Sequence, residues 1–133
     1  MASIEFIRPA GLVHSPAFSH VAVVPPGAKM IYLGGQNSVD EQGQLIGADD
    51  VAAQSVRALH NARLALNAAG ADLADVISWN VLLAQGVDVP RAYGAIAGEL
   101  SSPNPPLVSA SFVFGLGVPG ALVEISAVAA LFD

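Results

Sequence analysis

The 133-residue chain contains no cysteine, and only 12% of its residues are charged. Without cysteine, the chain has no disulfide framework, no thiol nucleophile and no thiolate metal ligand. Positive charge is also scarce, because five basic residues stand against eleven acidic ones and give a net charge of −6. The basic residues are scattered along the sequence, at Arg8, Lys29, Arg57, Arg63 and Arg91. Since binding to a phosphate backbone needs several positive charges on one face, we expect no nucleic-acid partner.

The sequence shows neither a secretory leader nor a membrane-spanning segment. Its first residues, MASIEFIRPAG, lack the basic region followed by an apolar run that marks a signal peptide. The most apolar stretch, 107–123, contains three glycines and a proline, which disfavour a spanning helix of about 20 residues. We therefore expect a cytoplasmic protein without a membrane partner.

Motifs for cofactors and metals are incomplete. GLGVPG has the glycine spacing of a dinucleotide-binding loop, but a strand-like run follows it where that motif requires a helix. His14, His20 and His60 lack the spacing of paired metal ligands on a helix. The sequence therefore predicts no cofactor and no metal.

Hydrophobic residues, by contrast, are abundant and make up 53% of the chain. A length of 133 residues corresponds to a single domain, which we place at 1–133. A lone domain of this size needs fewer apolar residues to fill its core. The surplus predicts that part of the surface packs against another subunit.

Hydrophobic periodicity and turn residues predict the element order βββαβαββ, an α+β fold with two helices on one face of a mixed sheet. Three short β-rich runs come first: IEFIRP, HVAVVP and KMIYLGGQ. Apolar residues at helical spacing between 51 and 66 predict a long helix that ends before Gly70. DVISWNVLLAQ then predicts a strand, VPRAYGAIAGELSS a second helix, and LVSASFVFGL with ALVEISAVAALF a hairpin joined at GVPG.

Glu124 is the one ionisable side chain in the apolar stretch 104–132. A carboxylate buried in a strand without a partner costs several kcal/mol, so this position needs a structural or chemical reason. Strand alternation places it on one face with Ser126 and Val128. Two interpretations stay open: a surface carboxylate on a solvated sheet face, or an acid or base in a cleft or subunit interface.

Several stretches resemble the RidA family of reactive-intermediate (enamine/imine) deaminases, and together they cover nearly the whole chain. The most specific are GGQ after a strand, the turn VDEQGQ, the helix and turn AQSVRALHNARLALNAAGADLADV, and the terminal LVEISAVA. The resemblance implies a chorismate-mutase-like fold, assembled as a homotrimer with ligand clefts between subunits. It also implies a chemistry in which an arginine pairs with the substrate carboxylate. A glutamate of the last strand then helps water attack a C=N carbon, which releases ammonia and a 2-keto acid.

Residue by residue, the match is partial. Glu124 corresponds to the family's glutamate, and Gly35 to a glycine whose backbone N–H lines the cleft. Leu107, in NPPLVSAS, replaces the arginine, and Phe18 replaces the tyrosine that caps the cleft. Because leucine offers a carboxylate no donor, we expect a less acidic or more apolar small-molecule ligand. The expected pocket contains Glu124 as the catalytic group and Phe18, Gly35, Leu107 and Trp79 as ligand-binding residues.

Two alternatives remain at this stage. In the first, the protein is a hydrolase, namely a true enamine/imine deaminase. Another cation then replaces the arginine, and Arg91 is the candidate. Otherwise it is a non-catalytic trimer that binds a small molecule or a protein. Turnover of 2-aminoacrylate separates the first alternative from the second.

Overall fold

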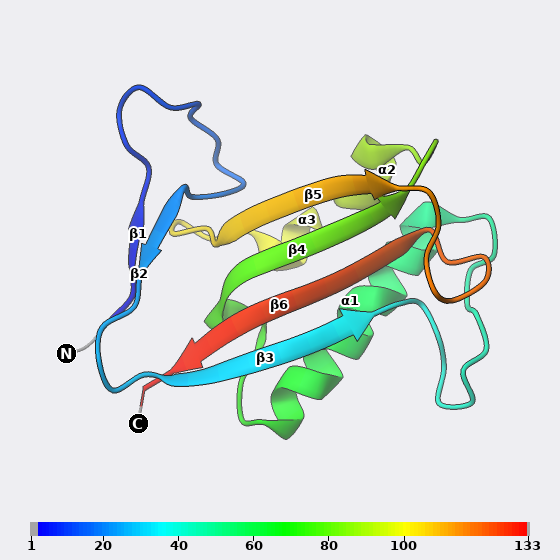
Figure 1. Ribbon diagram of the computed structural model, residues 1–133, viewed down its shortest axis with the longest axis horizontal. Helices are drawn as coiled ribbons and strands as arrows, with labels where there is room; N and C mark the ends of the chain where they lie inside the picture. Colours follow the sequence, from blue (N-terminus) through cyan, green and yellow to red (C-terminus); the bar gives the residue numbers. More distant parts are fainter. Residues whose placement is uncertain (1–2, 133) are drawn as a thin grey trace.

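The computed structural model describes residues 3–132. Figure 1 shows a four-stranded sheet with helices against one face, and a separate two-stranded sheet near the amino terminus. The mixed α+β fold with helices on one face of a mixed sheet agrees with the prediction from the sequence. None of the helices between residues 3 and 132 is long and apolar enough to cross a membrane.

The main sheet has the strand order β3-β6-β4-β5. Its central strand, β6 (Val123–Leu131), is antiparallel to both β3 (Lys29–Gln36) and β4 (Val76–Ala84). At one edge, β5 (Leu107–Val113) runs parallel to β4. The small sheet consists of β1 (Glu5–Ile7) and β2 (Val21–Val23), which pair antiparallel.

The last two strands do not form the hairpin that the sequence predicted, because β4 lies between them. A crossover through α2 and α3 joins β4 to β5, and connections of this kind place successive strands parallel. The loop 114–122 then returns past the end of β4, so that β6 pairs on both sides. The central position suits the apolar sequence of β6, in which every second residue from Val123 is buried.

The long helix α1 (Val51–Ala68) agrees with the predicted one. The side chain of Asp50 caps its start by accepting a hydrogen bond from the Ala53 N–H, and the chain turns away at Gly70 with φ of +84°. Its core side, which includes Ala58, Leu59, Ala62 and Leu66, packs on the sheet. A short 3₁₀ turn (Leu73–Asp75) leads from α1 into β4.

The predicted second helix is divided into two short ones, α2 (Val89–Gly94) and α3 (Ala97–Leu100). Asp88 caps α2 by accepting from the Arg91 N–H, with Pro90 in the first turn. Glycine costs a helix about 1 kcal/mol relative to alanine, and Gly94 and Gly98 both fall in this segment. The segment 89–100 therefore does not form one continuous helix.

The two faces of the main sheet differ in cover. The face toward the helices carries the core, including Leu33, Leu83 and Ile125. We call the other side the open face, because no helix of the described chain covers it (Figure 1). Its residues come from alternate positions of each strand: Tyr32 of β3, Glu124, Ser126 and Val128 of β6, Ser78, Asn80 and Leu82 of β4, and Leu107, Ser109 and Ser111 of β5.

Candidate functional site

Glu124 lies at the second position of β6, on the open face, and is half-buried. The ion pairs found within residues 3–132 join Arg63 to Asp72 and Glu99, and Glu124 takes part in none of them. No buried side-chain oxygen or nitrogen in this part of the chain lacks a hydrogen-bond partner. The Glu124 carboxylate is therefore reachable from the open face, where a water molecule or a ligand can contact it.

Gly35 provides the space for this carboxylate. A Cβ built on Gly35 would lie 2.8 Å from both Cδ and Oε2 of Glu124. The register between β3 and β6 shifts between Leu33 and Gln36, so Gly35 stands at a bulge, a feature that re-aims side chains at functional sites. Gly35 and Glu124 together are called the carboxylate half-site.

Asn37 holds the strand at this point. Its buried side chain donates a hydrogen bond from Nδ2 to the carbonyl oxygen of Val123, at 3.1 Å. Asn61 of α1 in turn donates from Nδ2 to the carbonyl oxygens of Asn37 and Val39, at 3.0 and 2.9 Å. The helix is thus connected to the backbone immediately before Glu124.

Gln54 fixes the loop that leads into β6. It is fully buried, and its Nε2 donates to the carbonyl oxygens of Gly47 and Gly120, at 3.1 and 3.2 Å. Its Oε1 accepts from the Leu122 N–H at 2.8 Å. One side chain of α1 therefore satisfies three backbone groups, two of which lie just before the carboxylate half-site.

Phe18 and Leu107 lie together at another place, and we call them the aromatic half-site. The Ser19 N–H donates to the carbonyl oxygen of Pro106 at 3.0 Å, which joins the loop of Phe18 to the start of β5. Both side chains are half-buried, and the Phe18 ring contacts the ring of His20 edge-on, with centroids 5.5 Å apart. The two predicted ligand-binding residues therefore come from adjoining segments.

The two half-sites stand far apart on one chain. Glu124 pairs with Leu82 of β4, whereas Leu107 pairs with Ser78, four residues earlier on the same strand. Four residues at about 3.3 Å each, and two strand spacings of about 4.8 Å, separate the Cα atoms of Glu124 and Leu107 by about 16 Å. One small metabolite cannot contact both side chains within a single chain.

Trp79 lies on the opposite side of the sheet from the Glu124 of its own chain, and it lines a cavity together with Ala17 and Pro106. It pairs with Ala127 on the helix side of the sheet and is only 4% exposed. Successive side chains of a strand point to opposite faces, so the indole of Trp79 lies behind the sheet and the Glu124 carboxylate in front of it.

The proposed substitute cation, Arg91, is exposed at the start of α2, on the helix side, and is thus remote from the open face. A different basic residue, Arg8, connects the segment before Phe18 to the segment before Leu107. Its guanidinium donates to the carbonyl oxygens of Ser15 and Pro103, at 3.1 and 3.2 Å. Nothing in the sequence signals this position, because Arg8 reaches the segment before Leu107 only through the fold.

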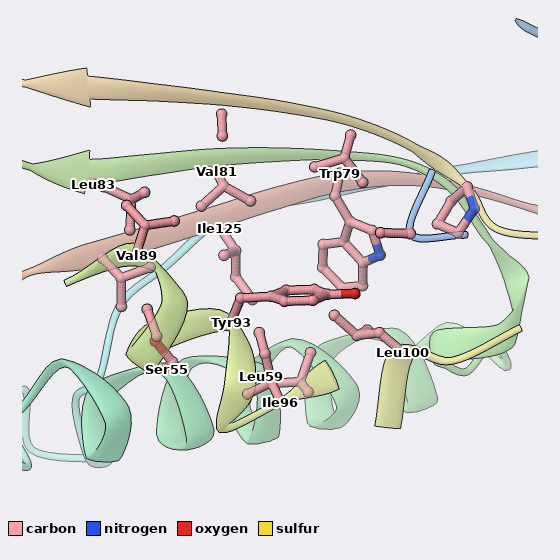
Figure 2. A pocket seen from close by; sticks show the side chains of 16 residues that line it. Ser55, Leu59, Trp79, Val81, Leu83, Val89, Tyr93, Ile96, Leu100 and Ile125 are labelled. Carbon is pink, nitrogen blue, oxygen red and sulfur yellow. The ribbon is translucent and has the colours of Figure 1, made fainter. Parts of the chain in front are cut away.

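A cavity of about 190 Å³ lies on the helix side of the sheet, where α2 and α3 cover it (Figure 2). Its lining is apolar apart from Ser55, Trp79 and Tyr93, and contains no charged residue. The cavity is partly open to solvent, because its lining residues Val89, Tyr93 and Val108 are exposed.

Comparison with known proteins agrees with the fold. The chain is similar to a Rid-family protein of unknown function from Yersinia pestis, with 28% identity, a TM-score of 0.83, and coverage of 96% of this chain and 98% of that one. It is also similar to RidA from an Antarctic Psychrobacter, with 27% identity, a TM-score of 0.69 and coverage of 93% of each chain. The E. coli YjgF gene product matches at 28% identity and a TM-score of 0.66, over 80% of this chain and 83% of that one.

No curated protein matches the chain significantly. The family model described as endoribonuclease L-PSP matches residues 12–131, which is most of the sequence. The chain therefore belongs to this family, that of the Rid and YjgF proteins.

Proposed function

We propose that the protein is a homotrimer that binds a small molecule between subunits, where the carboxylate half-site of one protomer faces the aromatic half-site of the next. The separation of the two half-sites on one chain is the observation that carries the proposal. Residues that correspond to one family site can meet at one ligand only when different protomers supply them. The resemblance to RidA proteins, which implies clefts between subunits, supports the same arrangement.

The open face supports association. Tyr32 is 76% exposed there, and Met30 beside it is also exposed, although both are large apolar residues. Leu82 and Val128 add apolar area on neighbouring strands. An exposed apolar surface of this kind is typical of a subunit interface, and it accounts for the hydrophobic surplus in the composition.

The chemistry of the half-sites selects the ligand. The carboxylate half-site offers an acceptor that can orient or deprotonate a water molecule. The aromatic half-site offers apolar surface, and Leu107 gives a substrate carboxylate no donor. A ligand carboxylate there would lose water without gaining a charged partner. We therefore propose a neutral or weakly acidic small molecule, which Glu124 hydrolyses by activating water.

One observation favours 2-iminoacid deamination as a second candidate. Arg8 connects the segments before Phe18 and Leu107, and two backbone carbonyls use only part of its five N–H donors. Arg8 can thus supply a cation in place of the arginine that Leu107 replaces. If it does, the protein turns over 2-aminoacrylate, and Arg8→Gln abolishes that activity without a change at Leu107.

The family description names an endoribonuclease, but the charge distribution argues against an RNA substrate. The chain carries a net charge of −6, and its five basic residues are scattered. Of these, Arg63 is paired with Asp72 and Glu99, and Arg57 with Asn61. A phosphate backbone therefore finds no basic face on this protein.

The absence of cysteine allows a direct test of the intersubunit site. Light scattering should first give the mass of a trimer. The Glu124→Cys protein and the Leu107→Cys protein should then be mixed, reassembled and treated with a short bis-maleimide, which should give a covalent dimer. A chain that carries both substitutions should gain no crosslink between its own two cysteines. Ala65→Cys, exposed on α1, replaces Glu124→Cys in the control mixture. A stable monomer, or equal crosslinking in the control, rules out the proposal.

A further inference from the structure

We propose that the cavity between the main sheet and α2 and α3 is a second binding site, for a small, uncharged and largely apolar molecule that carries one polar group. This site lies on the opposite side of the sheet from the carboxylate half-site, although Ala17 and Pro106, the neighbours of Phe18 and Leu107, also line it. Val123 and Ile125 line it from β6, whereas Glu124 between them points to the opposite face. A ligand in the cavity is therefore separated from the carboxylate half-site by the thickness of the sheet.

The size of the cavity fits a single aromatic ring with a substituent. Its volume is about 190 Å³, and an apolar protein cavity of about 150 Å³ takes up benzene. Entry is possible between α2 and the edge strand β5. There, the lining residues Val89, Tyr93 and Val108 are exposed to solvent, while Leu59 and Trp79 at the far side are buried.

The lining excludes charged ligands. Aliphatic and aromatic side chains form most of the wall, and no acidic or basic residue takes part. An ion placed there would lose its hydration without gaining a partner of opposite charge. A neutral apolar molecule, by contrast, replaces water on both surfaces.

Two side chains provide polar contacts for a ligand. Figure 2 shows the Tyr93 ring lying between the sheet and α1, with its hydroxyl on the side of Trp79 and Leu100. Neither the Tyr93 hydroxyl nor the Trp79 indole N–H makes a hydrogen bond among residues 3–132, and both residues line the cavity. The hydroxyl of Ser55 is already used, since it donates to the Val51 carbonyl oxygen at 2.8 Å.

The sequence of the covering segment explains why space remains. Between 89 and 100, small residues alternate with the few large apolar ones, Tyr93, Ile96 and Leu100. Ala92 is buried at the cavity wall, where a larger side chain would project into the space. Ala95, three positions on, is exposed and does not line the cavity. A leucine at position 92 therefore fills the cavity, whereas a leucine at position 95 changes the same segment without filling it.

Trp79 is the only tryptophan of the protein and reports directly on the site. The test titrates the assembled protein with 4-iodobenzyl alcohol and with 4-iodobenzoate, because iodine quenches indole fluorescence on contact. We expect saturable quenching by the alcohol, at least about tenfold tighter than any quenching by the benzoate. Ala92→Leu should weaken binding of the alcohol at least about tenfold, and Ala95→Leu should leave it unchanged within about twofold.

Ala110→Leu, at the exposed β5 side of the cavity, gives a second filling variant if Ala92→Leu does not fold. Three results overturn the proposal: no saturable quenching by the alcohol, equal quenching by the benzoate, or equal affinity in the filled variants. None of these measurements depends on Glu124 or Leu107. Failure here therefore leaves the proposed function untouched, and the converse also holds.

Discussion

The carboxylate of Glu124 occupies the space that a side chain on Gly35 would need, since a Cβ there would lie 2.8 Å from Cδ and Oε2. Glu124, the second residue of β6, thus lies against Gly35 at the bulge near the end of β3. Contacts below 3.0 Å force a shift, and the flexible end of a glutamate shifts more readily than the backbone. The identity of residue 35 thus decides where the acid of the carboxylate half-site lies.

Gly35→Ala should therefore move the carboxylate while preserving the fold. We expect a crystal structure of the variant to show Glu124 in a different rotamer, with a thermal midpoint within a few degrees of the parent. Gly34→Ala is the matched control, because a Cβ at Gly34 meets no atom within 4 Å. An unchanged Glu124 in the Gly35→Ala structure would contradict the argument.

Gln54→Leu should destabilise the protein strongly. The substitution removes the hydrogen-bond partner of three backbone groups, at Gly47, Gly120 and Leu122, in a partly buried place. Each unsatisfied group costs about 1–3 kcal/mol, and partial relaxation brings the expected loss to about 3 kcal/mol. Urea denaturation measures it. Gln44→Leu, at an exposed position, should change the unfolding free energy by less than about 0.5 kcal/mol; a similar loss in both variants would refute the role given to Gln54.

Asp72 should contribute stability that depends on pH. The Leu73 backbone N–H, followed by the Arg63 side chain 3.1 Å away, lowers the pKa of this carboxyl below its ordinary value of 3.8. A group whose pKa is lowered by folding stabilises the protein above its unfolded-state pKa, and this contribution is lost as the pH falls through the folded-state pKa. The effect is small, because both side chains of the pair are about half exposed to solvent.

Asp72→Asn isolates the charge, since asparagine can still accept from the Leu73 N–H. We expect the variant to be slightly less stable than the parent at about pH 7, and the difference to shrink as the pH falls below the ordinary carboxyl pKa of 3.8. Thermal unfolding across this range provides the measurement. A difference that persists in acid would show that the hydrogen bond, and not the charge, was lost.

Local features of the fold could be predicted from the sequence. Helix α1 was predictable because its cap at Asp50, its apolar spacing and Gly70 all lie within one continuous segment. The pairing of β5 with β4 was not, because it depends on a crossover and on a loop that brings β6 into the centre. The break between α2 and α3 had a visible cause in Gly94, although periodicity alone favoured one helix.

The candidate site was predictable only in part. Its residues came from family motifs, but motifs do not give the register that separates Glu124 from Leu107 on one chain. The sequence likewise does not give the side of the sheet on which Trp79 lies. The register between β4 and β6 shifts between Val76 and Ser78, and only the paired strands establish which face each later residue takes.

Leu107→Arg should create or sharply raise activity on small 2-iminoacids. The resemblance to RidA proteins implies an arginine at this position, where this chain has a leucine. A charge-assisted hydrogen bond to a substrate carboxylate contributes about 1.5–3 kcal/mol, which corresponds to roughly 10- to 150-fold in kcat/KM when the whole effect reaches the transition state.

The measurement compares kcat/KM for enzymatically generated 2-aminoacrylate in the parent, Leu107→Arg and Leu107→Met, the last of which changes shape without adding charge. Because Leu107 lies about 16 Å from Glu124 on its own chain, the new guanidinium cannot form an ion pair with that carboxylate inside one protomer. An ion pair between the new guanidinium and Glu124 can therefore form only between subunits. The gain in activity likewise requires two subunits. The gain should therefore vanish on dilution of the assembly to monomers. A change below about threefold in a folded, assembled variant would show that residue 107 does not face the substrate carboxylate.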